Sequence, residues 1–171
     1  MKPPSDQDER PGHPPRLPLS GAAAGSPSTA PPLRMALPAD WVAPSIARDR
    51  FDHWLRDLAW PVAQREDLVL ALSEAVSNSV EHGYGVPSGS AAHDSGVVEV
   101  RAELVAGPDQ ALRVVLTVRD AGGWREPAGS AHRGHGLRMI RAGGDEVVID
   151  GTDGGTTIRL TSRPAPRGRR G

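Results

Sequence analysis

Two polar residues one helical turn apart, Glu74 and Asn78, stand out in the stretch ALSEAVSNSVEHGYG, where most other residues are small or apolar. At about 100° per residue, the apolar residues of the predicted helix collect on one side and the two polar residues lie roughly opposite. The solvent side of an ordinary amphipathic helix has the same pattern. The pair also suits chemistry, because an asparagine carbonyl oxygen can bind a hard cation while a glutamate activates a nearby hydroxyl or water.

A second candidate is the segment VRDAGGW at 118 to 124, an apolar strand that ends in Asp120 and is followed by Gly122. A carboxylate at a strand end can accept a hydrogen bond from an exocyclic amine such as that of adenine. The neighbouring glycines, which have no side chain, would let a flat ring approach the backbone. An ordinary tight turn explains the same residues, because Asp and Gly are common in turns.

Two further glycine-rich segments follow. In RGHGLRMI, residues 133 to 140, Gly134 and Gly136 flank the start of a predicted helix, where backbone N–H groups can bind a phosphate. This is neither a Walker loop nor a Rossmann fingerprint, because the chain has no Gly-Lys-[ST] and no first βαβ unit. In GTDGGTTIRL, residues 151 to 160, Thr156 lies where a strand begins, and a hairpin turn is a sufficient explanation for that segment alone.

The elements that must position these segments are predicted from hydrophobic periodicity and turn residues. We expect an edge strand at 33 to 37, a helix from about 44 to 58, and a helix from about 61 to 82. A hairpin is expected from 97 to 104 and 112 to 120, then a short helix at 136 to 144 and strands at 145 to 150 and 156 to 162. The predicted fold class is α+β, a two-layer sandwich of a mixed, mostly antiparallel sheet with helices on one face.

The composition indicates one domain between two tails. The chain has 171 residues and 37% hydrophobic content, enough for one core. Residues 1–31 are rich in Pro, Gly and Ala and are expected to be a disordered tail, followed by a domain at 32–162 and a basic flexible tail at 163–171. The absence of cysteine excludes disulfides and thiolate metal sites.

The charge and hydropathy patterns limit the partners. The formal net charge is -1, which gives no general electrostatic reason to expect direct binding of nucleic acid. No stretch reaches the roughly 18 to 20 apolar residues that a membrane helix needs. We therefore expect a cytoplasmic protein without a membrane segment.

The order of the four segments resembles the N, G1, G2 and G3 boxes of the GHKL superfamily, whose ATP-binding domain has the Bergerat fold. The resemblance covers about residues 33 to 162. Three features are similar to the anti-sigma factor serine kinase branch: the compact size, the short connection from Asp120 to Gly136, and the form SEAVSNSVEHGYG of the N box. The cofactors that this resemblance implies are ATP and Mg²⁺.

The resemblance also implies residue roles. Asn78 corresponds to the Mg²⁺-binding asparagine, and Glu74 to the general base that accepts the proton of an attacking serine hydroxyl. Asp120 corresponds to the aspartate that reads adenine. Gly122 lets the ring approach, and Thr156 lies beside the aspartate and the base.

On the phosphate side, Gly134, Gly136 and Leu137 correspond to the backbone that contacts phosphate. Arg133 matches a lid arginine by position and not by motif. The sequence departs from the superfamily at Trp124, where the fuller Asp-x-Gly-x-Gly pattern has glycine, and this bears on how the lid moves.

The implied function is that of an ATP-dependent protein serine kinase acting as an anti-sigma factor. Such a protein binds a sigma factor and phosphorylates an anti-sigma antagonist, a STAS-type domain, on serine, and a homodimer is implied as well. The alternative is a non-catalytic module that switches partners according to its nucleotide. Glu74 favours the enzyme, because a pure binder needs Asn78 but no base.

Overall fold

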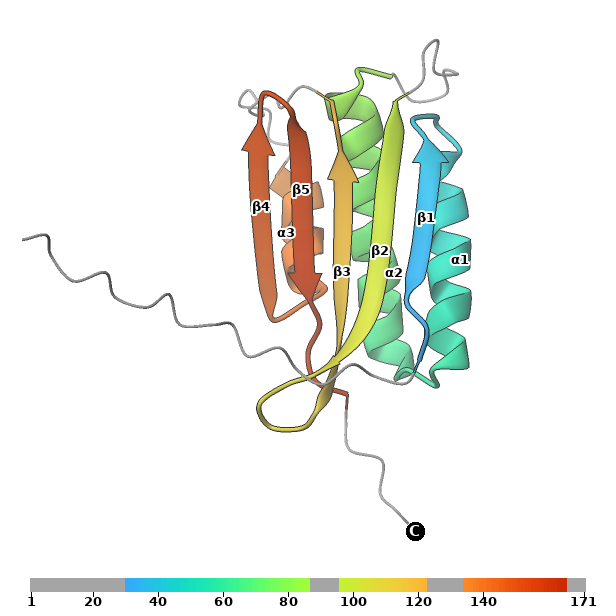
Figure 1. The fold of residues 1–171 in the computed structure, drawn as a ribbon, viewed down its shortest axis with the longest axis vertical. Coiled ribbons are helices and arrows are strands. Elements are labelled where there is room, and N and C mark those ends of the chain that lie inside the picture. Colours follow the sequence, from blue (N-terminus) through green and yellow to red (C-terminus); the bar gives the residue numbers. More distant parts are fainter. Residues whose placement is uncertain (1–29, 87–95, 123–133, 166–171) are drawn as a thin grey trace, which may run out of the picture.

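The computed structural model describes residues 30–86, 96–122 and 134–165, and for residues 134–137 it describes the backbone alone. Within these ranges the elements are, in chain order, β1 (Leu33–Pro38), α1 (Ala43–Asp57), α2 (Val62–Asn78), a π-helical turn (Ser79–Gly83), β2 (Val97–Ala106), β3 (Leu112–Asp120), α3 (Gly134–Ala142), β4 (Glu146–Thr152) and β5 (Gly155–Thr161). Figure 1 shows them as a sheet with helices behind it.

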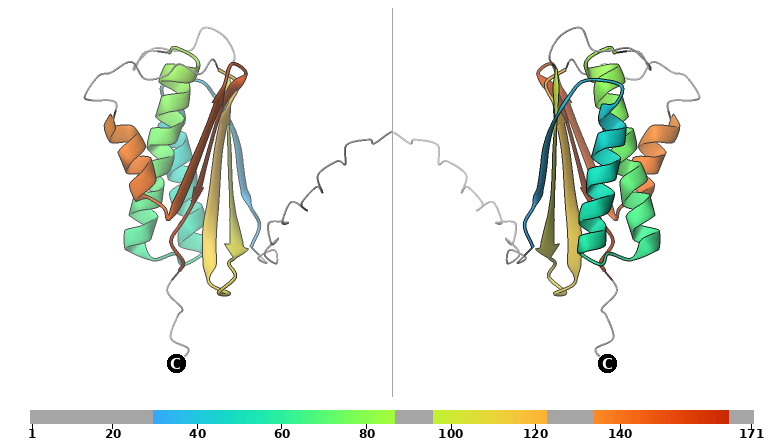
Figure 2. Two further views of the ribbon diagram at one scale, coloured as in Figure 1. Left: turned by 90° about the vertical axis from the view of Figure 1, so that its left-hand side faces the viewer. Right: turned by 90° about the vertical axis from the view of Figure 1, so that its right-hand side faces the viewer.

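The sheet has the strand order β1-β2-β3-β5-β4, and all four strand pairings are antiparallel. The three α-helices cover one face of the sheet (Figure 2). The predicted α+β sandwich is therefore confirmed. Because β5 lies between β3 and β4, the end of β3 is beside the start of β5, and Asp120 pairs in register with Thr156.

The core lies between the sheet and the helices. Helix α1 begins beside a proline in its first turn, where the missing N–H does no harm, and it buries Phe51 and Leu55 completely. Helix α2 starts directly after Pro61 and buries Leu68, Leu72 and Val76. On β2, Val98 and Val100 point to the same core, while alternate residues of that strand are exposed. The core thus fixes α2 over the central strands.

The largest difference from the predicted elements is at the end of α2. The sequence predicts one helix through residue 82, whereas the structure ends α2 at Asn78 and continues with the wider turn Ser79–Gly83. Periodicity does not distinguish the two, because the apolar face changes little over a single turn. The other boundaries differ by two residues or fewer, as is usual for helix and strand ends.

The chain beyond β5 lies against the domain for four residues, 162 to 165. The Arg163 guanidinium donates to the Ala142 carbonyl at 2.9 Å, and the Gln64 amide donates to the Pro164 carbonyl at 3.2 Å. Most of the two predicted tails, 1–31 and 163–171, lies outside the described residues, which leave out 1–29 and 166–171, so the domain boundaries stay predictions. None of the helices described is long and apolar enough to cross a membrane.

Candidate functional site

Asp120 is a buried carboxylate at the last position of β3, with 4% of its surface exposed. Its Oδ1 accepts two backbone hydrogen bonds, from the Gly122 N–H at 3.1 Å and from the Thr156 N–H at 3.2 Å. Among the described residues no hydrogen bond ends on Oδ2. One oxygen therefore holds the side chain in place, and the other accepts no hydrogen bond from the described residues.

Three glycines allow the backbone to pack closely around Asp120, and one of them, Gly83, lies against the carboxylate itself. A Cβ at Gly83 would stand 3.0 Å from Asp120 Oδ1, and a Cβ at Gly122 would stand 2.1 Å from the Gly83 carbonyl oxygen. Gly155 has a φ of +129°, and its Cβ would stand 2.0 Å from the Asp120 carbonyl oxygen. Side chains at Gly122 and Gly155 would clash with neighbouring backbone, so these glycines permit the close packing around Asp120, and the role expected for Gly122 toward a ring stays a prediction.

The π-helical turn brings Gly83 to this place. It is closed by a hydrogen bond of 3.1 Å from the Tyr84 N–H to the Ser79 carbonyl, five residues earlier, whereas an α-helix spans four. The extra residue widens the turn and carries the Gly83 backbone up to Gly122 and Asp120. The sequence analysis missed this turn, and only the glycines at 83 and 85 hinted that the helix changes there.

Tyr84 ties this turn to the sheet. Its hydroxyl donates to the Val97 carbonyl at 2.8 Å and accepts from the Ala121 N–H at 3.0 Å. Its ring lies so close to Gly96 that a Cβ there would meet ring carbons at 2.4 Å. One side chain therefore joins the end of the π-helical turn, the start of β2 and the residue after Asp120. The sequence analysis assigned no chemistry to it.

Helix α3 packs tightly along α2. A Cβ at Gly143 would stand only 2.7 Å from the Ala71 Cβ and 3.1 Å from the Asp67 carbonyl oxygen. From there α3 extends back toward the end of the molecule at which α2 finishes, as Figure 2 shows. At about 1.5 Å per residue, Ala71 to Asn78 spans about 10 Å and the nine residues of α3 about 13 Å. The start of α3 therefore lies near the level of Glu74 and Asn78.

Glu74 and Asn78 are both partly exposed, one turn apart on α2, and Asn78 is the last residue before the π-helical turn. The turn continues from there to Gly83 beside Asp120. Figure 1 shows the ends of α2 and β3 and the start of β5 at the same end of the sheet. The residue pair predicted from sequence, Glu74 and Asn78, is thus connected to the surroundings of Asp120 by the five residues of the π-helical turn.

For the remaining predicted site residues, the structure describes either the backbone alone or nothing. Gly134, Gly136 and Leu137 lie in the first turns of α3, where the backbone is described and the side chains are not. Arg133 and Trp124 lie outside the described residues. The structure brings Asp120, Gly122 and Thr156 into direct contact, and the roles inferred for the phosphate side stay predictions.

Comparison with known proteins agrees with this geometry. Residues 37–162 match the family described as the histidine kinase-like ATPase domain. The chain is also similar to the solved structure entitled "The crystal structure of the RsbU and RsbW domains of Rv1364c from Mycobacterium tuberculosis". The identity is 32%, the TM-score is 0.62, and the match covers 82% of this chain and 34% of that one. The chain thus spans about a third of the length of that structure.

The family match covers well over half of the chain and includes Glu74, Asn78, Asp120 and Thr156. This family match and the similarity of the chain to a structure with an RsbW domain confirm the resemblance to the GHKL superfamily that was inferred from the four sequence segments. An ATPase domain of this kind implies ATP binding. The chain belongs to the histidine kinase-like ATPase domain family, in the GHKL superfamily, and is related to its RsbW-like, anti-sigma factor kinase branch.

Proposed function

We propose that this chain is an ATP-dependent protein serine kinase that acts as an anti-sigma factor, binding a sigma factor and phosphorylating a STAS-type antagonist on serine. The observation that carries the proposal is the position of Glu74. This carboxylate lies one turn before Asn78 on the helix that continues, through the π-helical turn, to the buried Asp120. A nucleotide bound at Asp120 with its phosphates toward α3 would have a metal ligand and a base beside it.

The hydrogen bonds of Asp120 support the proposal that this residue binds the adenine ring of ATP. Two backbone N–H groups fix Oδ1, so Oδ2 can accept a hydrogen bond from the exocyclic amine of adenine. Guanine has a carbonyl oxygen at the same ring position, and two acceptors facing each other in a buried site are unfavourable. Asp120 therefore selects ATP over GTP in this proposal.

The packing of α3 along α2 supports the proposal that the phosphates of ATP bind between Asn78 and the start of α3. The amide oxygen of Asn78 would hold the Mg²⁺ that accompanies the nucleotide, which typically keeps water and phosphate oxygens as its other ligands. The start of α3, with Gly134 and Gly136, has N–H groups without a partner inside the helix, at the positive end of the helix dipole. Arg133, just before this helix, would add a positive charge toward phosphate.

Glu74 would take the proton from the serine hydroxyl of the partner. Mg·ATP supplies the phosphoryl group when bound, and phosphoryl transfer needs positioning and charge neutralisation more than a strong base. Side chains at this spacing on a helix lie about 5 to 6 Å apart at Cβ, which places the carboxylate beside the atoms that Asn78 orients. A non-catalytic partner switch would need Asn78 and Asp120 but would have no use for Glu74.

The test is phosphotransfer with purified protein, Mg·ATP and candidate STAS-domain partners, read as phosphoserine on the partner. Glu74→Gln should lower transfer at least about 100-fold and leave ATP affinity nearly unchanged. Asn78→Ala should weaken binding of Mg·ATP as well. Glu66→Gln is the matched control, because Glu66 is an exposed glutamate two turns earlier on the same helix.

Two results would contradict the proposal in different ways. If the wild type binds ATP and a sigma factor but phosphorylates no STAS partner, the non-catalytic alternative is correct. If it binds no ATP, the assignments of Asp120 and Asn78 are wrong. Homodimer formation and a cytoplasmic location belong to the same proposal, and sedimentation velocity and cell fractionation test them.

A further inference from the structure

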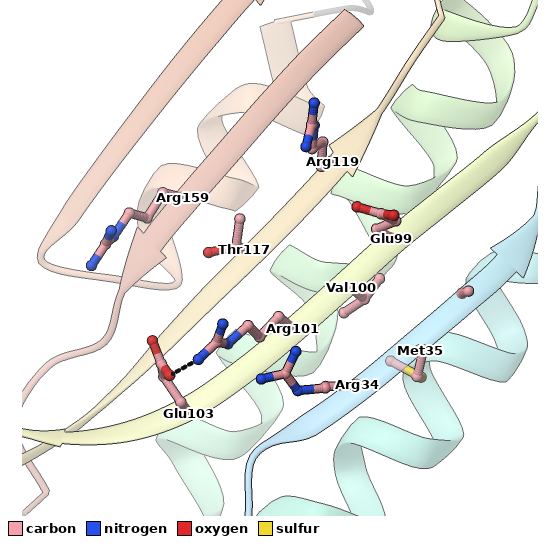
Figure 3. Close-up of a pocket in the computed structure, with 10 residues that line it drawn as sticks. Arg34, Met35, Glu99, Val100, Arg101, Glu103, Thr117, Arg119 and Arg159 are labelled. Atoms are coloured by element: carbon pink, nitrogen blue, oxygen red, sulfur yellow. Dashed lines mark hydrogen bonds and ion pairs between the residues drawn. The ribbon is translucent and has the colours of Figure 1, made fainter. Parts of the chain in front are cut away.

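The chain turns toward the helices where β5 ends. On that strand, Arg159 points to the face of the sheet away from the helices, where it lines a hollow of about 570 Å³ (Figure 3). Strict alternation would direct Arg163, four residues later, to the same face. Instead, the Arg163 guanidinium contacts α2 and α3 on the other face. A local change in the backbone therefore redirects this side chain.

The change begins at Ser162, which lies opposite Val114 when the register of β5 with β3 is continued. The Ser162 N–H donates to the Val114 carbonyl at 2.9 Å. In a regular antiparallel pair the Val114 N–H would donate back to the Ser162 carbonyl, but here it donates to the Ser162 hydroxyl oxygen at 2.9 Å. The hydroxyl in turn donates to the Arg163 carbonyl at 2.8 Å. The side chain of Ser162 thus takes the place of its carbonyl in the sheet.

The pairing with β3 also shifts by one residue beyond Ser162. The continued register would place Leu112 opposite Pro164, which has no N–H to donate. The Leu112 carbonyl accepts instead from the Ala165 N–H at 2.8 Å. One extra residue on one of two paired strands is the geometry of a β-bulge, which re-aims a side chain. This bulge directs Arg163 to the side of the helices and keeps its backbone attached to β3.

One nitrogen of Arg163 links α2 to α3. It donates to the carbonyl of Ala142, the last residue of α3, at 2.9 Å, and it lies 3.5 Å from Asp67 Oδ2 on α2. Carbonyls in the last turn of a helix have no partner inside the helix, and a positive charge beside them is favourable. Arg163 therefore caps the C-terminal end of α3 and connects that end to α2.

Close packing holds the same end of α3. Gly143 follows the helix, and a Cβ there would stand 3.1 Å from the Asp67 carbonyl oxygen. A Cβ at Gly144 would stand 2.5 Å from the Thr161 carbonyl oxygen at the end of β5. The chain after α3 thus passes between α2 and β5 without space for a side chain. Arg163, two residues beyond β5, supplies the polar contacts of this junction.

We propose that Arg163 is a positioning residue for the phosphates of ATP and that it acts through α3. This inference rests on the proposed function, in which N–H groups at the start of α3 contact phosphate. The nine residues of α3 span about 13 Å and move as a rigid rod. A tilt of about 5° at the C-terminal end therefore moves the first residues by about 1 Å. A misplacement of that size is enough to weaken the contacts with phosphate.

The effect of Arg163 should be confined to the phosphates. The bulge pairs with the start of β3, whereas Asp120 is the last residue of that strand. Six residues separate Val114 from Asp120, which is about 20 Å along an extended strand. Solvent and salt screen a charge over that distance. Adenosine, which has no phosphate, should therefore bind equally well with or without the arginine.

The test compares Mg·ATP with adenosine, using calorimetric titration for the nucleotide and NMR titration for the weaker nucleoside. In Arg163→Gln the Kd for Mg·ATP should rise about fivefold, while the Kd for adenosine should stay within about twofold of the wild type. Arg163→Lys should keep the Kd for Mg·ATP within about twofold, because a single ammonium can make both contacts. The matched control is Arg141→Gln, which removes the same charge from the last turn of α3. The control should bind Mg·ATP within about twofold of the wild type.

Three results would overturn the inference while the wild type still binds ATP, so the proposed kinase activity would stand. Equal weakening of ATP and adenosine in Arg163→Gln would mean that the arginine acts on the whole fold. Unchanged ATP binding would mean that α3 keeps its position without it. An equal loss in Arg141→Gln would make the charge at the helix end the cause, and not the contacts. If the wild type binds neither ligand, the proposed function fails and this inference fails with it.

Discussion

The hydroxyl of Tyr84 is expected to hold the adenine end of the site in position, and Tyr84→Phe removes only that hydroxyl. The hydroxyl bonds both the Val97 carbonyl and the Ala121 N–H, and Ala121 lies between Asp120 and Gly122. The phenylalanine ring would still pack on the backbone of residue 96. The variant therefore separates the hydrogen bonds from the packing of the ring.

The expected loss follows from the number of bonds. A hydrogen bond within a protein contributes about 0.5 to 1.5 kcal/mol net, so losing two lowers the free energy of unfolding by about 1 to 3 kcal/mol. Without these bonds, Ala121 and its neighbour Asp120 are more mobile in the folded protein. If ordering them again on ATP binding costs about 1 kcal/mol of binding free energy, the Kd for ATP rises about fivefold.

The measurements are urea unfolding and calorimetric titration with ATP, and Trp41→Phe serves as the control. Trp41 is an aromatic residue with 55% of its surface exposed, so its replacement should change neither quantity by much. A residue that positions Asp120 should also change selectivity, so the preference for ATP over GTP should narrow in Tyr84→Phe. In the phosphotransfer assay, KM for ATP should rise while kcat changes little.

The reasoning fails if Tyr84→Phe loses stability but binds ATP within about twofold of the wild type and keeps the same preference over GTP. In that case the Tyr84 hydroxyl stabilises the fold but does not position Asp120 for ATP binding. If stability is also unchanged, the two hydrogen bonds contribute nothing measurable.

Two further predictions concern the hairpins. Gly155→Ala should lower the free energy of unfolding by more than about 2 kcal/mol in urea titrations, because φ is +129° and the new Cβ would stand 2.0 Å from the Asp120 carbonyl oxygen, whereas Gly154→Ala should be tolerated. Hydrogen bonds from Arg113 hold the pKa of Asp109 below its usual range. A depressed carboxyl pKa adds stability that is complete above the unfolded pKa of about 3.9 and is lost as the pH falls. The difference in Tm between wild type and Asp109→Asn should therefore be constant above about pH 5 and shrink below about pH 4.

The parts of the site that the sequence predicts are those that depend on local signals. A strand that ends in Asp120 followed by glycine, and a helix with Glu74 and Asn78 one turn apart, can be recognised within a short window. The contact of Asp120 with Thr156 cannot, because it depends on β5 lying between β3 and β4. Thirty-six residues separate the two, and only the known order of the four boxes linked them.

The π-helical turn could not be predicted from the sequence for a different reason. The residues of Ser79–Gly83 suit an α-helix about as well as a wider turn, since the two differ by one hydrogen-bond step. What selects the wider turn is its surroundings, where the Gly83 backbone meets Gly122 and the Tyr84 hydroxyl meets Ala121. These partners are about 40 residues away along the chain, so no local pattern reveals them.

The alternation of side chains along β3 connects the two faces of the sheet. Arg119 and Asp120 are consecutive, so Arg119 points to the face of the sheet away from the helices and Asp120 to the side of the helices. A slip of β3 by one residue would bury Arg119 and expose Val118 and Asp120. The core residues Leu116 and Val118, with 2% and 1% exposure, oppose that slip. The same apolar contacts that stabilise the sheet therefore keep the Asp120 carboxylate on the side of the helices and the Arg119 guanidinium on the opposite side.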